Sequence, residues 1–439
     1  MTKWLGKLAR DQRGVSLVLV LCILVVFGTL GLVTHSLVTT DLDSSVKLHD
    51  SSQAFWAAEA GIELACRFLR YANPPPGGTQ PFVQFDRVPC GQGHFTVTID
   101  PNDNNPNTYL KAYTVTSLGV CGEARRAIRV ELGMKTFSHY AYCTNSEGSS
   151  TIWFVTGDVI EGPLHSNDRI AIYSRPVFLG PVTSAATSFR KGAAYNPDFR
   201  SGYQLGVPPI AFPTFQDVTN NYWALNTDPP EVVLDARFSR HASVTLNADG
   251  TITYSVWHST SSGIVYDLAP TTRPVSDLRG ILFVQGDVEI SGTLDGQLTV
   301  VATELIRIVD DLRYAASDAS GRPAEGCDDL LGLISGGDVV VADTPPNRND
   351  VVIDASILAL GNSFTVENYN SGSARGYLRL WGSLAQKVRG PVGTFGYGGS
   401  QTGYLKDYHY DLRLLNVVPP YYPSTGQYRI YSWQEVDAD

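Results

Sequence analysis

Two pairs of adjacent carboxylates are the side chains of this sequence best suited to acid–base chemistry. Asp310-Asp311 and Asp328-Asp329 have Arg307, Arg313 and Arg322 near them in the chain. Glycoside hydrolysis needs two carboxylates roughly 5–9.5 Å apart across a cleft. Neighbouring residues of a strand point to opposite faces, which counts against either pair sharing one site. We expect these acids to serve in turns, and a carbohydrate-active β-helix enzyme remains the less favoured alternative.

His165 beside Ser166 and Asn167 is the other group with catalytic residue types. The pattern favours a turn over a catalytic arrangement. No GxSxG, HExxH or P-loop motif occurs in the chain. The sequence therefore predicts no catalytic residue, no enzyme activity and no cofactor.

Six cysteines could in principle bind metal or form disulfides: Cys22, Cys66, Cys90, Cys121, Cys143 and Cys327. No CxxC or Cys/His spacing points to zinc, so no metal site is predicted. In an exported domain, Cys90 and Cys121 could bridge two neighbouring strands. Free buried thiols are an equally good interpretation of the same two residues.

Composition limits the elements that position these residues. The 439 residues suffice for two or three folded units. With 41 Gly, 25 Pro and 17% charged residues, the chain is typical of a turn-rich β protein. A formal charge of −10 argues against nucleic acid as a partner, because nucleic-acid binding needs a basic face.

The N-terminus carries a basic leader followed by an uncharged run. Lys3, Lys7, Arg10 and Arg13 precede Val15–Val33, which has 19 residues without a charge. As a helix this run spans roughly 28 Å, close to the thickness of a bilayer core. No small-residue exit site follows it, so the helix is predicted to stay in the membrane over 15–38. The leader positives place the C-terminus outside the inner (cytoplasmic) membrane, with a single pass.

The junction Gln12-Arg13-Gly14, followed by Val15-Ser16-Leu17-Val18-Leu19, resembles the class III signal of type IV pilins. The resemblance implies that prepilin peptidase removes residues 1–14 after Gly14 and that Val15 is then N-methylated. The family usually has a glutamate at the fifth mature position, which is Leu19 here. That acid pairs with the amine of the subunit ahead in the fibre, and an unpaired acid in a membrane is costly. Leu19 therefore implies a tip or initiating subunit.

The segment that follows predicts how the helix meets its cargo. Its Ala54-Phe-Trp-Ala-Ala58-Glu-Ala-Gly61 resembles the "AFxAAEAG" stretch of PilX-like minor pilins. Spacings of three and four residues also predict one stripe that packs on the head, formed by Phe55, Ala58, Ile62, Ala65 and Leu69. The helix is predicted over 15–72, ending before Asn73-Pro74. A plain membrane anchor with a coiled segment is the alternative.

Downstream the patterns change to β structure. Alternation in His94–Ile99, Tyr113–Ser117 and Ala127–Leu132 predicts a small antiparallel sheet over 81–134, covered by the helix stripe.

The remainder, 135–439, is predicted to be a β-solenoid because a strand–Gly-Asp–strand phrase recurs. The copies are Phe154-Val-Thr-Gly157-Asp158-Val159, Phe283-Val-Gln-Gly286-Asp287-Val288 and Leu333-Ile-Ser-Gly-Gly337-Asp338-Val339. Two rungs fit between the second and third copies. Residues 187–275, with Pro-rich segments and a hairpin over Val244–Val256, are read as an insertion. A β-sandwich remains the alternative fold.

Together these features predict an α+β protein that acts as a minor pilin-like subunit of a type IV pilus or related secretion filament. Its predicted place is the tip, where it primes assembly and displays a head for adhesion or partner binding on the cell surface. The implied partners are other major and minor pilins, prepilin peptidase, the inner-membrane assembly platform and membrane lipid. A surface glycan or protein is the candidate ligand of the head. A membrane-tethered solenoid adhesin or scaffold outside any pilus is the alternative.

Overall fold

The computed structural model describes residues 12–72, 76–103, 111–219, 230–396 and 399–438. Within them the chain forms two compact units. The first falls within Met1–Asn104, Tyr113–Leu132 and Ile430–Asp439, and the second within Asn105–Ala112 and Gly133–Arg429. The second unit is thus inserted into the chain of the first.

The first unit begins with one long helix, α1 (Gln12–Tyr71), of 60 residues. Its first half is rich in Leu and Val and its second half in Ala, both compatible with a helix. It ends shortly before Pro74-Pro-Pro76, in agreement with the predicted range 15–72, because a residue before proline disfavours helical geometry. The leader residues 1–11 lie outside the described residues.

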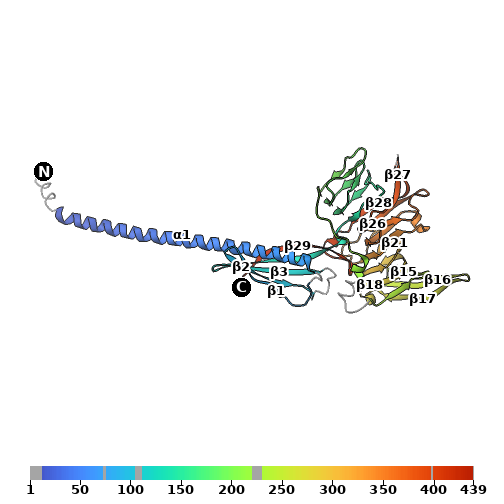
Figure 1. Ribbon diagram of the computed structural model, residues 1–439, viewed down its shortest axis with the longest axis horizontal. Coiled ribbons are helices and arrows are strands. Elements are labelled where there is room, and N and C mark those ends of the chain that lie inside the picture. The colour runs from blue at the N-terminus through green and yellow to red at the C-terminus, as the bar shows by residue number, and fades with distance from the viewer. Residues whose placement is uncertain (1–11, 73–75, 104–110, 220–229, 397–398, 439) are drawn as a thin grey trace. The chain divides into compact units, whose positions relative to one another are not determined.

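An antiparallel sheet packs on the C-terminal half of α1 (Figure 1). In the order of the sheet its strands are β1 (Phe82–Cys90), β2 (Gly93–Asp100), β3 (Ala112–Cys121), β4 (Ala124–Thr136) and β29 (Ser424–Val436). The long apolar helix with an antiparallel sheet confirms the first part of the predicted fold class. The predicted solenoid range 135–439 needs correction. Strand β29, near the end of the chain, is the fifth strand of this sheet and not part of the solenoid.

Parallel strands stacked as rungs make up most of the second unit. A first ladder runs in the spatial order β14 (Val233–Ala236), β18 (Ile281–Gly286), β20 (Gln297–Ala302), β22 (Leu330–Ser335), β24 (Val351–Ala359), β26 (Ala374–Val388), β5 (Tyr142–Ser146), β7 (Leu164–Ser166), β10 (Val182–Ser184) and β13 (Tyr203–Leu205). Every pairing in this ladder is parallel.

Two further parallel ladders close the rungs. One contains β15 (Arg240–Asn247), β19 (Val288–Leu294), β21 (Ile306–Tyr314), β23 (Val339–Val341) and β25 (Phe364–Val366). The other continues from β24 and β26 through β28 (Gly399–Tyr410), β6 (Val159–Ile160), β9 (Val177–Phe178) and β12 (Asp198–Phe199). The short pair β8 (Ala171–Ile172) and β11 (Arg190–Lys191) is also parallel. Antiparallel pairing occurs where β15 meets β16 (Thr251–Thr260), β16 meets β17 (Gly263–Pro274), and β27 (Gly393–Gly396) meets β28.

These parallel ladders are those of a β-solenoid, as predicted, and a β-sandwich of antiparallel sheets does not fit them. The second and third Gly-Asp phrases lie two rungs apart, with β20 between β18 and β22. The predicted insertion at 187–275 needs correction. Strands β11 to β15 within it pair with solenoid strands, so they are rungs, and the hairpin β16–β17 extends from them.

The order of the rungs in space differs from their order in the chain. The chain enters the stack at β5, in the middle of the first ladder, and proceeds to β13 at one end. It then reappears as β14 at the opposite end and returns through β18 to β26, which pairs with β5. The described part of the connection, residues 206–219, is called the strap below.

The first ladder buries both of its faces. Alternate residues such as Leu282 and Leu384 belong to the core inside the solenoid. Their neighbours, such as Phe283 and Ala385, belong to a second core outside it, which also contains Ile210 and Val218 of the strap. Strands buried on both faces read as continuous apolar runs, as in Leu330-Leu-Gly-Leu-Ile334.

Candidate functional site

The first half of α1 presents apolar side chains to its surroundings. From Leu17 to Leu48 its large apolar residues are exposed, and Leu19 has 59% of its surface accessible. An 18-residue window in Ser16–Arg70 has a mean hydropathy of 2.9, long and apolar enough to cross a membrane by length and composition. Gly14 and Val15 belong to the first turn of α1. This half of the helix is therefore a surface that needs a lipid or protein partner.

The second half of α1 lies against the sheet through very small residues. A Cβ added to Gly119 of β3 would lie 1.9 Å from the carbonyl oxygen of Ala54 and 2.6 Å from the nitrogen of Ala58. A Cβ on Gly61 would lie 2.1 Å from Ser117 Oγ. The Ala/Gly-rich segment thus lets the helix backbone approach the sheet backbone, which a larger side chain on either side would prevent.

The structure buries four of the five residues in the predicted helix stripe. Ala58, Ile62, Ala65 and Leu69 are each at most 3% exposed. Phe55 is only half-buried and lies beside the stripe, where its ring contacts Trp433 of β29 at a centroid distance of 6.3 Å. Its place in the stripe is taken by Ala54 and Ala57.

The last strand, β29, joins this interface through a small polar network. Trp433 Nε1 donates a hydrogen bond to Glu59 Oε1 at 3.0 Å. Arg126 of β4 forms an ion pair with Glu435 and donates to Ser51 Oγ at 2.8 Å. Sequence patterns did not predict these contacts, because the partners on the helix and on β29 lie more than 300 residues apart in the chain.

Cys90 and Cys121 are both free, which corrects the suggested disulfide. Cys90 pairs across to Gly93 on β2, and Cys121 lies on β3, on the other side of β2. Two strands separated by a third are about 9.6 Å apart, beyond the roughly 7 Å that a disulfide can span. The Cys121 thiol instead lies 3.9 Å from Asp50 Oδ1, and burial raises its pKa.

In the solenoid, the aspartates of the repeated phrase connect successive rungs. Asp287 Oδ1 accepts a hydrogen bond from the Leu305 amide at 2.9 Å, and Asp338 Oδ1 accepts one from Ser363 at 2.7 Å. Each donor belongs to the next rung. In the second and third copies the corner acid therefore satisfies a backbone amide of the neighbouring rung. In the first copy Asp158 instead accepts from Val155 of its own phrase at 3.0 Å.

The two acid pairs also bind backbone amides. Asp311 Oδ1 accepts from Val352 at 2.8 Å, at an irregularity of β21. Asp329 accepts from Gly296 at 2.7 Å and from Ala316 at 3.1 Å. The other member of each pair, Asp310 or Asp328, is exposed. Asp328-Asp329 thus lies between strands, as the turn prediction expects, whereas Asp310-Asp311 lies within β21, where the prediction of a turn was wrong.

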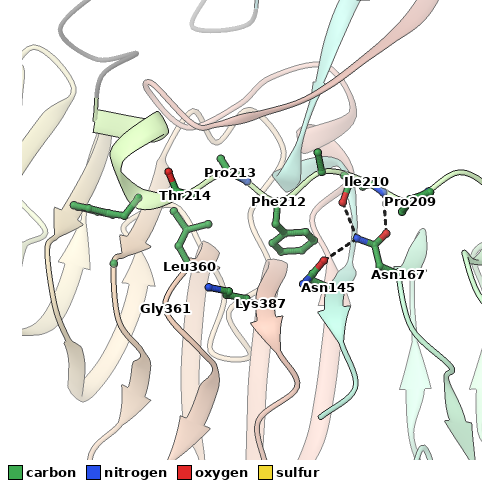
Figure 2. A pocket seen from close by; sticks show the side chains of 13 residues that line it. Asn145, Asn167, Pro209, Ile210, Phe212, Pro213, Thr214, Leu360, Gly361 and Lys387 are labelled. Atoms are coloured by element: carbon green, nitrogen blue, oxygen red, sulfur yellow. Dashed lines mark hydrogen bonds between the residues drawn. The ribbon is translucent and has the colours of Figure 1, made fainter.

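His165 lies on β7 and forms part of a clamp on the strap. Its Nδ1 is 2.9 Å from Thr183 Oγ1 and its Nε2 is 2.9 Å from Asn167 Oδ1. Asn167 in turn accepts from the Ile210 amide at 2.8 Å and donates to the Ile210 carbonyl at 2.6 Å (Figure 2). Burial lowers the pKa of His165, with the Asn167 hydrogen bond opposing the shift. The Asn167 amide therefore pairs with the strap as a neighbouring strand would.

A groove of about 560 Å³ lies where the strap passes over the first ladder (Figure 2). Its floor contains Lys387 of β26 and Asn145 of β5, and Phe212 and Phe215 contribute its aromatic groups. Leu360, Gly336 and Gly361 complete the floor beside Lys387. No sequence pattern indicated this groove, because the residues that line it come from six separated segments.

Buried charges lie where β26 and β28 meet β5 and β6. Arg389, 1% exposed, pairs with Glu147 at 2.9 Å, and its guanidinium lies 3.9 Å from the centre of the Phe154 ring. Lys406 pairs with Asp158 of the first Gly-Asp phrase at 3.1 Å. Buried pairs of this kind contribute little net stability, but they can specify register. Here they join rungs that are more than 240 residues apart in the chain.

Comparisons with known proteins find one matching family model and matching solved structures. A family model described as "Domain of unknown function (DUF4900)" matches residues 108–187. Among solved structures, the chain is similar to the competence-associated pilin ComZ from Thermus thermophilus, at 12% identity and a TM-score of 0.31. That match covers 88% of this chain and 97% of the other. No curated protein matches the chain.

Proposed function

We propose that this chain is a minor pilin-like subunit of a type IV pilus or a related secretion filament. It is inserted in the inner membrane before assembly and then joins the fibre at the cell surface. Its partners are other pilins, prepilin peptidase, the assembly platform and membrane lipid. The proposal includes no catalysed reaction.

The observation that carries the proposal is the division of α1 into two halves. The first half is uncharged from Leu17 to Thr40, and its large apolar side chains are exposed. The second half packs on an antiparallel sheet through Ala54, Ala58 and Gly61. A helix that only anchored the chain in a membrane would not need a second half fitted so closely to its own sheet. Beside this stands the pilin-like leader junction at Gly14.

Two features support a position at the tip. Leu19 replaces the acid that would pair with a subunit ahead, and an apolar residue there needs no such partner. The inserted unit within Gly133–Arg429 is larger than the unit that carries it. A head of this size on each subunit would crowd a thin fibre, which favours few copies, with the solenoid displayed for adhesion or partner binding.

Mass spectrometry of the mature N-terminus tests the pilin-like role. We expect the mature wild-type chain to begin at methylated Val15. In a Gly14→Glu variant, we expect residues 1–14 to be retained. A wild-type chain that retains residues 1–14 in the membrane would overturn the proposal and favour a tethered adhesin.

The tip position has a separate test in Leu19→Glu. We expect no gain in the amount of the chain recovered with sheared fibres, because a tip subunit has no amine ahead of it for the new acid to pair with. A sharp rise in incorporation, relative to a Leu17→Gln control, would contradict the tip position and leave the pilin-like role standing.

A further inference from the structure

We propose that the groove between the strap and the first ladder binds an acidic saccharide, with a carboxylate at Lys387 and a sugar ring on Phe212. This goes beyond the pilin-like role, and it would hold for the free chain whether or not the chain enters a fibre.

The floor of the groove is built by one row of the parallel ladder. Gln386 is in register with Thr144, and Thr144 with Ser166. The residues that follow these three, Lys387, Asn145 and Asn167, therefore stand side by side on neighbouring rungs. Figure 2 shows them in a row beneath the strap. Parallel register thus holds a cation and two amides at the roughly 4.8 Å spacing of strands.

The row presents hydrogen-bond donors that the protein itself does not use. Within the part of the chain that the structure describes, Lys387 Nζ has no ion pair or hydrogen bond, and the lysine is exposed. Asn145 Oδ1 accepts from Asn167 at 3.0 Å, which leaves the Asn145 amide nitrogen unpaired among the described residues. None of the residues that line the groove is acidic. The charge and the free donors therefore select an anion, and the two oxygens of a carboxylate can accept from both groups.

The opposite side of the groove supplies an apolar surface. Phe212 is held by Phe137, with a ring-centroid distance of 4.7 Å, and Figure 2 shows it above Lys387 and Asn145. A sugar offers an apolar C–H face to such a ring and hydroxyl groups to the Asn145 amide. A fixed aromatic group with a few convergent polar groups is typical of small-ligand sites, and 560 Å³ lies within their range of about 300–1,000 Å³.

The strap fixes this geometry without a ligand. Asn167 holds the Ile210 backbone at both its amide and its carbonyl, two residues before Phe212. The groove is therefore preformed, and binding does not have to order the wall.

The test uses the purified full-length chain in detergent, titrated with trigalacturonate, maltotriose and a triaspartate peptide. We expect trigalacturonate to bind, with affinity that falls as salt rises. Lys387→Gln should weaken it about tenfold, and Phe212→Ala by a similar factor. Lys191→Gln is the matched control, because Lys191 is an exposed lysine outside the groove and should have no effect.

Several results would overturn the proposal. They are no binding of trigalacturonate, equal binding of maltotriose, tighter binding of triaspartate, or equal losses in Lys387→Gln and Lys191→Gln. If the circular dichroism spectrum of Lys387→Gln is unchanged, its loss of binding is not caused by a loss of fold. None of these results bears on the mature N-terminus or on fibre incorporation, so failure here and failure of the pilin-like role can be told apart.

Discussion

The C-terminal half of α1 in the first unit and the strap in the second unit both cover an apolar β surface, and they do so with side chains of opposite size. The helix uses Ala54, Ala58 and Gly61 and approaches the backbone of its sheet. The strap uses Ile210, Phe212 and Val218 and stays at the distance that these side chains impose.

The difference follows from where the backbone hydrogen bonds go. A helix satisfies its own amides and carbonyls, so it can lie on a sheet with no polar contact between them. The strap is helical only over 215–219, and Ile210 lies before that turn. A non-helical segment outside a sheet has no such internal partners, and its buried groups need others. Asn167 supplies both partners for Ile210. The solenoid therefore needs a polar clamp at the strap, whereas the helix needs only small residues where it meets the sheet.

Of the substitutions that test this comparison, Gly119→Val should have the largest effect on stability. The new side chain would collide with the backbone at Ala54 and Ala58, which cannot move aside as a side chain can. We expect a loss of about 3 kcal/mol or more in the stability of the first unit. Denaturant unfolding of the purified chain in detergent measures it. Gly28→Ala is the control, since nothing lies within 4 Å of its added Cβ. Equal stability of both variants would mean that the helix and sheet are not so closely packed.

Asn167→Ala should have the next largest effect, confined to the strap. It removes both hydrogen bonds to buried Ile210, which we expect to cost about 2 kcal/mol. Hydrogen exchange of the Ile210 amide should accelerate accordingly. Asn145→Ala removes an amide of the same row that has no hydrogen bond to Ile210 among the described residues, and it should leave this exchange nearly unchanged. Similar acceleration in both variants would contradict the clamp.

Acidification should loosen the strap by a smaller amount. Burial lowers the pKa of His165 below its usual value of 6.5. The unfolded state then binds a proton more readily than the folded state, so His165 contributes stability above about pH 6.5 that is lost as the pH falls toward its folded pKa.

Exchange of the Ile210 amide, corrected with an unstructured reference peptide, should show more opening at pH 5 than at pH 7. A His165→Gln variant should lose this dependence, because glutamine does not titrate. A dependence that persists in the variant would assign it to another group, such as His139, whose pKa burial lowers to about 4.

Much of the fold follows from local pattern in the sequence. The uncharged run after Val15 and the three-and-four spacing from Ala58 to Leu69 indicate the helix and its buried stripe. The repeated Gly-Asp phrase indicates the rungs, and in two of its three copies the corner acid accepts from an amide one rung away. The groove could not be predicted from the sequence, because Lys387, Asn145 and Phe212 come from three separate segments and none of them lies in a motif.

Sequence alone determined the kinds of element in this protein, because propensity, alternation and turn residues act over a few positions. Only the tertiary structure decided which elements are neighbours. It placed β5 beside β26 and β29 in the first sheet, and it left Cys90 and Cys121 separated by a strand. The physical reason is that rungs of similar pattern can pair with one another almost equally well. Contacts such as Arg389 with Glu147, whose partners lie 242 residues apart in the chain, join the rungs that are neighbours in the structure.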